Sequence, residues 1–399
     1  MKEFIIPLKD AFTKGLNPEG KIDAASNPEQ IYGVRVTKSG IKLFNFQSLL
    51  DALPNDIGET LTFTALYTDH AISVNPPFPQ MLSVGTLTAL LTPTRFFYLT
   101  STGGLNEQNL YDAYNTSDVA EALGNNIWQY AVIGDTYILT NGKSCIFKRP
   151  SSLKHYVENT IPINACAYYK GHIVRAGFSI TSYENDEWGW YRFEERQRVG
   201  SLYQSYLTRS SIMWTSVNAR DLFWLYYPEE AFEDYEGLED YDIYRDWLSR
   251  NDSGSMTLSS LGEILVLKQL GENLIAYGTK GTAVLGYQVS PFPSLTVEKV
   301  FDFRIAYPQS VAGDVSGHLL VSTTGELIYL SVEGPKYLGY GSYFPTSSGP
   351  YTVLHNADKQ EFYISCATSS FLYNGELVNL QYIATSYINL DGYPLIIYR

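Results

Sequence analysis

The dominant pattern along the chain is a short run of alternating apolar and polar residues, a tight turn, and a second such run. From 127 to 148 the sequence reads IWQYAV, a turn at Gly134-Asp135, TYILT, a turn at Asn141-Gly142, and KSCIFK. Period-two alternation is typical of a half-buried strand, and Asn-Gly favours a hairpin because both central residues of a type I′ turn need positive φ. We therefore predict an antiparallel three-stranded unit here.

The same unit recurs at a regular spacing. Further hairpins are predicted within 32–46, 86–100, 165–176, 264–287, 311–331 and 351–380. Inner turns near Gly271, Gly317 and Asp358 are 46 and 41 residues apart. A period of about 40–50 residues with four strands per unit is typical of a β-propeller. We predict an all-β protein, a β-propeller of roughly six to eight blades, with another large multi-sheet β architecture as the alternative.

Two segments interrupt this rhythm and divide the chain. We predict an N-terminal arm with a terminal strand over 1–31, a first β-propeller part over 32–182, an acidic and aromatic insertion with embedded strands over 183–255, and a second β-propeller part over 256–399. Short helices are predicted only at 115–123, where an N-cap candidate and an acidic first turn fit a helix start, and at 240–250. The apolar runs 4–6 and 395–398 are predicted to lie in one blade and close it.

Composition narrows the possible functions. The chain has 28 Lys and Arg against 42 Asp and Glu, a net charge of −14. Affinity for phosphate comes from clustered Lys and Arg, so the charge disfavours general nucleic-acid binding. Aromatic residues make up 15%, including 33 Tyr, and they favour strands. No apolar run reaches the 18 or more residues of a membrane span, and the first residues lack a signal-peptide pattern. We expect a protein that is made in the cytosol and is soluble.

The chemistry-bearing residue types form no catalytic motif. Cys145, Cys166 and Cys366 are widely spaced and odd in number, which excludes a disulfide framework and favours buried thiols. The histidines are scattered, and His172 and His318 follow turn glycines, so we expect structural roles for both. The segment YGTKGTA, 277–283, lacks the spacing of a phosphate-binding loop, and its glycines are expected to serve turns. We predict no enzymatic activity, no cofactor and no metal.

The insertion holds the candidate functional residues. Between 229 and 246 there are nine carboxylates and one Arg. Candidate channel-lining or interaction acids are Glu229, Glu230, Glu233, Asp234, Glu236, Glu239, Asp240 and Asp242. Candidate subunit-contact aromatics are Trp188, Trp190, Phe223, Trp224, Tyr226 and Tyr227. The same acids could ligate Ca²⁺, hydrolyse glycosides as a pair, or form a solvated face, and the aromatics could stack on sugars.

Three stretches resemble a known family. The lead-in FTKGLNPEGKIDAASNPEQIYGVRVTKSGIKLFN, 12–45, resembles the opening of tailed-phage β-propeller proteins of the tail-nozzle or packaged-DNA-stabilisation kind. The run from IMWTS to DLFW, 212–224, and ILVLKQLGENLIAYGTKGTAVL, 264–285, are similar to blades of that family. The chain departs from the pattern at Thr215-Ser216, where the family has a plain Trp-Ser, and the acidic insertion does not align.

The resemblance implies a structural virion protein without catalytic residues. It would form a homo-oligomeric ring, with a hexamer as the candidate order, at the head-to-tail or nozzle position of a phage tail. It would contact the portal, adaptor and other tail proteins, pass double-stranded DNA without sequence preference, and avoid membranes. Assembly would take place in the host cytoplasm.

The acidity of the chain suits such a conduit. A wall that must release DNA should not bind phosphate, and its negative charge repels DNA within about 8–10 Å at physiological salt. Two other classes stay open. One is a carbohydrate-binding or glycoside-cleaving propeller that uses the 183–255 insertion for tail-associated receptor contact, and the other is a propeller scaffold for protein partners. We take the nozzle or head-to-tail adaptor as the leading prediction.

Overall fold

The computed structural model describes residues 34–37, 40–43, 80–84, 87–91, 95–99, 105–108, 110–112, 127–134, 136–148, 155–158, 163–179, 207–217, 252–289, 294–357, 359–380, 384–390 and 393–398. These residues form strands, turns and four single-turn 3₁₀ helices, and none of them is α-helical. The 3₁₀ helices are η1 (Ser259–Leu261), η2 (Pro308–Ser310), η3 (Gly341–Tyr343) and η4 (Thr346–Ser348).

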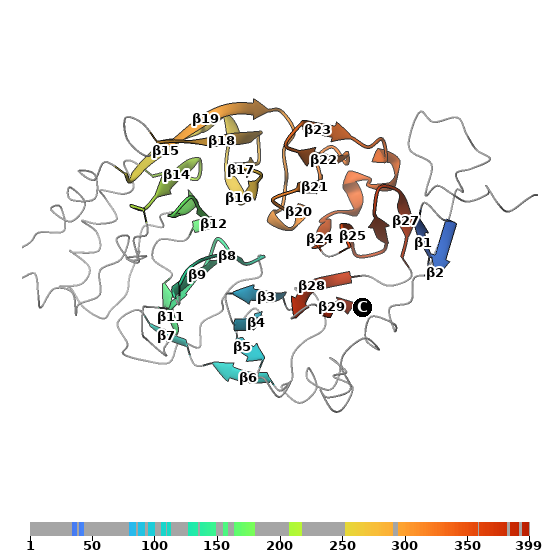
Figure 1. Cartoon of the computed structure of the whole chain (residues 1–399), viewed down its shortest axis with the longest axis horizontal. Coiled ribbons are helices and arrows are strands. Elements are labelled where there is room, and N and C mark those ends of the chain that lie inside the picture. The colour runs from blue at the N-terminus through green and yellow to red at the C-terminus, as the bar shows by residue number, and fades with distance from the viewer. Residues whose placement is uncertain are drawn as a thin grey trace, which may run out of the picture. The chain divides into compact units, whose positions relative to one another are not determined.

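Six sheets of four or five strands follow one another along the chain (Figure 1). The first two contain β3 (Gln80–Val84), β4 (Leu87–Leu91), β5 (Phe96–Leu99), β6 (Leu105–Gln108), and then β7 (Leu110–Asp112), β8 (Gln129–Ile133), β9 (Thr136–Thr140), β10 (Cys145–Lys148) and β11 (His155–Glu158). In the five-stranded sheet the order is β7-β11-β10-β9-β8, and β7 pairs with β11 in parallel.

The remaining four sheets are four-stranded antiparallel meanders. They contain β12 (Ile163–Tyr169), β13 (His172–Phe178), β14 (Ser211–Trp214) and β15 (Gly254–Thr257); β16 (Ile264–Leu270), β17 (Asn273–Gly278), β18 (Thr282–Gln288) and β19 (Ser294–Phe301); β20 (Val311–Asp314), β21 (Gly317–Val321), β22 (Leu327–Ser331) and β23 (Gly334–Tyr337); and β24 (Thr352–Asn356), β25 (Glu361–Ser365), β26 (Ser370–Tyr373) and β27 (Leu377–Asn379). Two hairpins complete the strands: β1 (Val34–Thr37) with β2 (Gly40–Leu43), and β28 (Ala384–Leu390) with β29 (Tyr393–Tyr398).

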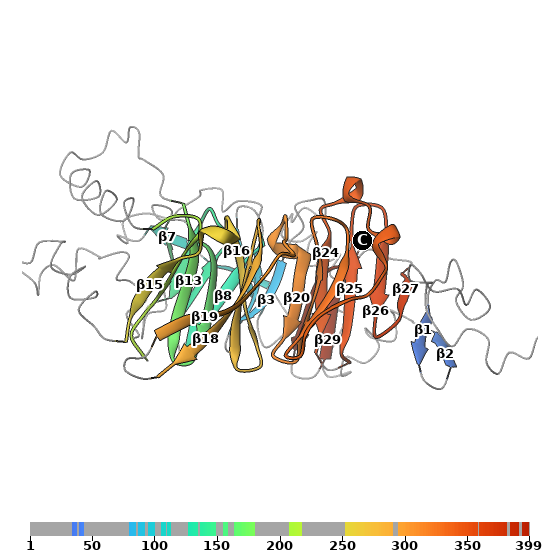
Figure 2. The ribbon, with the colours of Figure 1, turned by 90° about the horizontal axis from the view of Figure 1, so that it is seen from above.

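Repeated meanders of this kind are the blades of a β-propeller, and the chain is a six-bladed β-propeller. The predicted fold class is therefore confirmed, with a blade number inside the predicted range. The predicted register is visible in the last three blades, whose first strands begin at Ile264, Val311 and Thr352, 47 and 41 residues apart. Figure 2 shows β24, β25 and β26 side by side within one of these blades.

The chain divides into two compact units, and each has its own apolar core. The first unit comprises 1–83, 99–105 and 305–399, and the second comprises 84–98 and 106–304. In the first unit, side chains such as Leu319, Phe344 and Ile364 fill the space between the β20–β23 and β24–β27 blades. In the second, one core lies between the β12–β15 and β16–β19 blades, and another joins β8–β10 to β12–β14. Aliphatic and aromatic packing between neighbouring blades is thus the main stabilising interaction.

One glutamine connects an edge strand from each of three successive blades in the second unit. Gln129 on β8 donates from Nε2 to the carbonyl of Asn164 on β12 (3.0 Å) and to that of Leu265 on β16 (2.7 Å). The Leu267 N–H on β16 donates to Gln129 Oε1 (3.3 Å). The side-chain amide therefore makes the hydrogen bonds that a backbone amide makes within a sheet, but it makes them between strands of different sheets.

The predicted hairpins form, but the turn chemistry differs at one of them. Asn141-Gly142 is not a type I′ turn, because only Gly142 has positive φ and Thr140 pairs with Cys145 across a four-residue loop. Asn141 Oδ1 instead accepts from the backbone N–H groups of Lys143 (3.0 Å) and Ser144 (2.8 Å). An Asx turn of this kind provides an acceptor for the backbone N–H groups of the loop, and it does not need the positive φ that we expected of Asn141.

The type I′ conformation occurs at another predicted turn. Lys170 and Gly171 both have positive φ, 49° and 91°, and they connect the paired residues Tyr169 and His172. The glycines of YGTKGTA do serve the β17–β18 hairpin. At Gly278 a Cβ would collide with the Leu261 carbonyl, so the absent side chain lets η1 approach β17.

The cysteines and turn histidines occupy the buried positions that we expected. Cys145, Cys166 and Cys366 are buried thiols, and His172 and His318 are fully buried. The predicted helices at 115–123 and 240–250, and the N-terminal run 4–6, lie outside the described residues. Closure of a blade by both termini therefore stays a prediction; on the C-terminal side, β29 pairs with β28.

Candidate functional site

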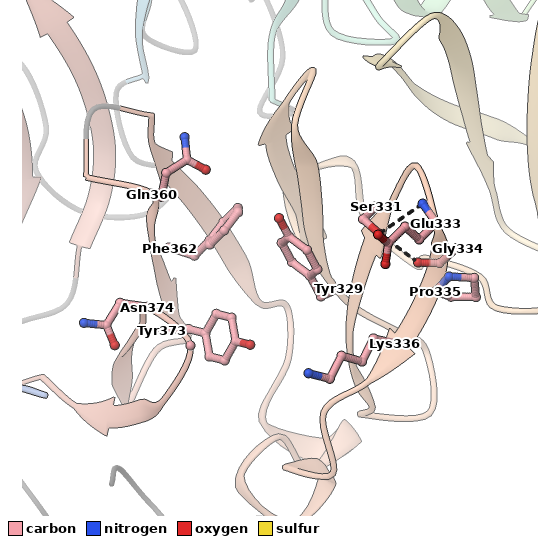
Figure 3. A pocket seen from close by; sticks show the side chains of 11 residues that line it. Tyr329, Ser331, Glu333, Gly334, Pro335, Lys336, Gln360, Phe362, Tyr373 and Asn374 are labelled. Atoms are coloured by element: carbon pink, nitrogen blue, oxygen red, sulfur yellow. Dashed lines mark hydrogen bonds between the residues drawn. The ribbon is translucent and has the colours of Figure 1, made fainter. Parts of the chain in front are cut away.

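A pocket of about 540 Å³ opens in the first unit where two neighbouring blades end in tight turns. We call it the turn-end pocket (Figure 3). Its lining residues come from the β22–β23 hairpin, the start of β25 and the β26–β27 turn: Tyr329, Ser331, Glu333, Gly334, Pro335, Lys336, Gln360, Phe362, Tyr373, Asn374 and Gly375. The volume is within the range of small-ligand sites, about 300–1,000 Å³.

Aromatic side chains from both blades form the wall. Tyr329 from β22 meets Phe362 from β25 edge to face, with ring centroids 6.2 Å apart and planes at 79°. Behind Phe362, the His355 ring stacks at a centroid distance of 4.5 Å and fixes the position of the phenyl group. Figure 3 shows the Tyr373 ring on the same side of the pocket as Phe362. The rings are thus held by the core of the unit: Tyr329 is half-buried and offers the main aromatic surface, whereas Phe362 (3% exposed) and Tyr373 (8% exposed) border the pocket with little of their surface.

The hydroxyl groups on this wall are neutral at physiological pH. Burial, with help from Glu376 and Tyr329, raises the pKa of Tyr373 to about 12. Burial and the nearby Asp314 likewise raise the pKa of Tyr329. Both phenols therefore keep their protons and can donate as well as accept hydrogen bonds.

The polar rim is held in place by hydrogen bonds within its turns. Ser331 Oγ accepts from the Glu333 N–H (3.3 Å) and donates to the Gly334 carbonyl (3.4 Å), which orders the β22–β23 turn. Gln360, in a positive-φ conformation, donates from Nε2 to the Ala357 carbonyl (2.8 Å). Lys336 lies on the exposed half of β23, and its ammonium group extends toward Tyr373 in Figure 3.

A second polar cluster lies in the other unit, around a buried histidine. His172 Nδ1 is 2.6 Å from the Thr215 carbonyl, and Nε2 is 3.0 Å from the Tyr287 hydroxyl. A carbonyl can only accept, so Nδ1 carries the proton and Nε2 accepts from Tyr287. Burial lowers the pKa of His172 despite the opposing effects of Thr215 and Asp252. The imidazole is therefore a neutral structural group between two blades.

The predicted insertion corresponds to two connections that both start and end in the β12–β15 blade. The chain leaves β13 after Ser179 and returns at Leu207, and it leaves β14 after Val217 and returns at Asp252. At the first exit the Phe178 N–H donates to the Thr208 carbonyl (3.2 Å). At the second, the Val217 N–H donates to Asp252 Oδ2 (2.9 Å). These exits lie at opposite ends of β14, a strand that is buried throughout.

All sequence-predicted site residues lie outside the described part of the chain. The aromatics Trp188 and Trp190 belong to the connection between Ser179 and Leu207, and the other candidates, from Phe223 to Asp242, belong to the connection between Val217 and Asp252. The two candidate sets therefore stay predictions. Among the residues that the structure does describe, no three His, Cys, Asp or Glu side chains gather as they would around a metal ion. Within the same residues, no helix has the length and apolarity to cross a bilayer.

Sequence reasoning missed the turn-end pocket. Tyr329, Phe362 and Tyr373 lie in the runs ELIYLS, EFYISC and SFLY, which look like ordinary strand cores. Their alternation predicts strands correctly, but it does not say that one side of each ring borders a space between two blades. The signal that could have found them is an aromatic residue within two positions of a strand end, next to a turn, in two consecutive blades.

Comparison with known proteins adds similarity at the level of the fold. No family model matches the chain, and no curated protein matches it. Among solved structures, the Pan2 WD40 domain of Neurospora crassa is similar over 82% of this chain and 89% of its own, with 6% identity and a TM-score of 0.40. The extracellular domain of the putative one-component system BT4673 from B. thetaiotaomicron is similar over 80% of this chain, with 7% identity and a TM-score of 0.43. The match spans 37% of that chain.

Proposed function

We propose that the chain is a non-enzymatic structural protein of a tailed-phage particle, a ring-forming tail nozzle or head-to-tail adaptor that borders the DNA path. The observation that carries the proposal is the acidic connection between Val217 and Asp252, which contains nine carboxylates and one Arg from 229 to 246. Both of its ends are fixed on the β14–β15 edge of one blade, where Trp214 pairs with Gly254. A concentration of negative charge in one segment of the sequence is what a wall facing DNA requires.

Electrostatics supports a wall that repels DNA. Phosphates of DNA are attracted by Lys and Arg clusters and repelled by carboxylates, and the repulsion acts over about one Debye length, 8 Å at physiological salt. A concentrated patch near the DNA path would therefore act more strongly than the same charge spread over the surface. The sequence resemblance of 12–45, 212–224 and 264–285 to tail-nozzle proteins agrees with this role.

The DNA path in this proposal runs through the ring of subunits rather than through one propeller. Gln129 bridges the edge strands β8, β12 and β16 within hydrogen-bond distance, so these strands leave no space for a duplex between them. A propeller blade packed in this way is a rigid building block. In a closed ring, one face of each copy would meet a different face of the next.

Imaging with the portal tests the proposal directly. We expect purified protein mixed with a cognate portal complex to dock as a coaxial ring in negative-stain images. A protein that stays monomeric with the portal and instead hydrolyses a polysaccharide would contradict the nozzle assignment.

A charge-matched pair of variants tests the acidic connection. Glu239→Gln with Asp240→Asn removes two charges from it, whereas Asp302→Asn with Glu326→Gln removes two from exposed positions elsewhere. We expect only the first pair to slow DNA ejection from assembled particles, measured by dye release or light scattering. Equal ejection rates for both pairs would place the acidic connection away from the DNA path.

A further inference from the structure

We propose that the turn-end pocket binds a neutral saccharide. The inference goes beyond the structural role proposed above and does not depend on it. The pocket combines about 540 Å³ of space, an aromatic wall and a ring of neutral hydrogen-bonding groups. A sugar ring presents an apolar C–H face and a rim of hydroxyl groups, and each of these features has a counterpart in the pocket.

The aromatic wall suits the C–H face of a sugar. Tyr329 and Phe362 are fixed by their mutual edge-to-face contact and by the His355 stack, so little side-chain entropy is lost on binding. Tyr373 is largely buried, and only a narrow part of its ring borders the pocket. Preorganised aromatic side chains with a solvent-accessible polar end are typical of sites for amphipathic ligands.

The rim suits hydroxyl groups. Around the rings lie the side-chain amides of Gln360 and Asn374 and the phenols of Tyr329 and Tyr373, whereas Ser331 Oγ donates its proton to the Gly334 carbonyl and can only accept. The phenols stay protonated because burial raises the pKa of each. Groups that both donate and accept match hydroxyls, which do the same, better than they match a phosphate or an ammonium group.

The charge of the pocket favours a neutral ligand. One cation, Lys336, and one anion, Glu333, line it. Two further carboxylates lie close enough to act on the wall: Asp314 raises the pKa of Tyr329, and Glu376 raises that of Tyr373. An anionic ligand would meet one ammonium against three carboxylates. Uronic acids and phosphorylated sugars are therefore expected to bind more weakly than neutral ones.

Binding can be tested on the full-length protein with neutral oligosaccharides. The probes are trisaccharides of glucose, galactose, mannose and N-acetylglucosamine, examined by saturation-transfer NMR and calorimetry. We expect one of them to bind with a dissociation constant of about 0.1–5 mM, in the range of small, open sites. Saturation should be strongest at the ring C–H protons, which face the aromatic wall.

Two variants and a matched control locate the site. Tyr329→Leu keeps an apolar side chain against the core but removes the ring, and we expect at least a tenfold loss of affinity. Lys336→Gln lies on the exposed side of β23, so it tests the rim without affecting the core, and we expect about a threefold loss. The control Tyr307→Leu changes an exposed tyrosine of the same unit outside the pocket and should leave affinity unchanged.

Each other outcome overturns the assignment. The proposal fails if the folded wild-type protein binds none of the probes at about 10 mM. It also fails if Tyr329→Leu and Lys336→Gln, with unchanged thermal melting, bind as well as wild type. Capture of an aromatic tripeptide that no sugar can displace would assign the pocket to a peptide instead. Ring docking of Tyr329→Leu with the portal reports separately on the structural role.

Discussion

At the scale of single residues, Gly177 marks a close approach of two blades. Gly177 in β13 has φ of +73°, and a Cβ there would collide with the backbone carbonyl of Ile264 at the start of the next blade. It would also lie 2.7 Å from Asn164 Nδ2. Gly134 in the β8–β9 turn has a similar φ of +61°, but nothing lies within 4 Å of its hypothetical Cβ. A comparison of substitutions at the two positions therefore distinguishes the energetic cost of a positive φ from the cost of a steric collision.

We expect Gly177→Ala to be far more damaging than Gly134→Ala. A left-handed φ costs an alanine about 1–2 kcal/mol at either position, whereas overpacking against a fixed backbone adds about 1–3 kcal/mol at Gly177 alone. Chemical denaturation with fluorescence detection should show the difference in the free energy of unfolding. Equal losses in the two variants would mean that the blades can move apart at this point without cost.

His172 should make stability depend on pH. Burial holds its pKa below the ordinary value of 6.5, so the unfolded chain binds a proton more readily than the folded one. The stabilisation from the neutral imidazole is complete above that ordinary value and falls as pH drops below it, until the folded-state pKa is passed. The melting temperature of wild type should therefore decrease between pH 7.5 and pH 5.5.

A substitution isolates this contribution. His172→Gln cannot take up a proton, so its melting temperature should change less over the same range, although its absolute stability is lower. The nearby Asp252 has a lowered pKa, so its contribution is lost only at pH values below about 4 and falls outside the window. If the melting temperatures of wild type and variant depend on pH in the same way, His172 is not a neutral, buried group.

Residue-level predictions from the sequence succeeded where local chemistry decides. The turn glycines, the buried cysteines and the structural histidines follow from local pattern alone. Asn141 shows the limit: its side chain can cap a four-residue loop or adopt positive φ, and the neighbouring strand register selects the loop. Local sequence contains both possibilities, and only the pairing of Thr140 with Cys145 chooses between them.

At the scale of elements, Gln129 connects strands that no sheet joins. Gln129→Ala would remove three hydrogen bonds and leave the Leu265 carbonyl and the Leu267 N–H without this partner. Loss of buried hydrogen-bond partners costs about 1–3 kcal/mol. We expect this loss in the free energy of unfolding, with faster hydrogen exchange at Leu267.

The control for Gln129 is another half-buried glutamine. Gln269 Nε2 donates to the Gly271 carbonyl two residues away (3.0 Å), a contact inside one hairpin. Gln269→Ala should cost less and should leave exchange at Leu267 unchanged. If both alanine variants behave alike, the bridge between β8, β12 and β16 adds nothing beyond a local hydrogen bond.

Element order was predictable because each blade is a local meander. The 47- and 41-residue steps between the last three blades follow directly from turn signals. The step from β12 to β16 is 101 residues, because two long connections interrupt that blade. Strand β14 between them has only four residues, and its place in the blade depends on pairing with β13 and β15 rather than on local pattern.

At the scale of the whole molecule, the site was harder to predict than the fold. The spacing of the repeats indicates a propeller even without an alignment of individual residues between the repeats. The turn-end pocket, in contrast, depends on how the β22–β23 turn of one blade faces the start of β25 in the next. Such packing between repeats leaves no pattern within either repeat, so Phe362 and Tyr329 could be predicted as strand residues but not as neighbours.

The net charge of −14 has a consequence for ring assembly. Copies of like charge repel one another, and the repulsion weakens as salt shortens the Debye length from about 14 Å at 0.05 M to about 4 Å at 0.5 M. If apolar contacts hold the proposed ring, assembly should therefore strengthen as salt rises over this range. Mass photometry of the protein mixed with a portal complex, as in the imaging test of the proposed function, measures the fraction in rings.

A variant with less charge sharpens this expectation. Residues 219–250 contain ten carboxylates and three Arg, so their replacement by a short Gly-Ser linker changes the net charge from −14 to −7. The blade should still form, because Trp214 and Gly254 on either side of the linker are paired neighbours. Repulsion between copies then falls, and the salt dependence of assembly should become shallower. Weaker assembly at high salt in wild type would instead mean that charge-complementary contacts, and not apolar ones, join the subunits.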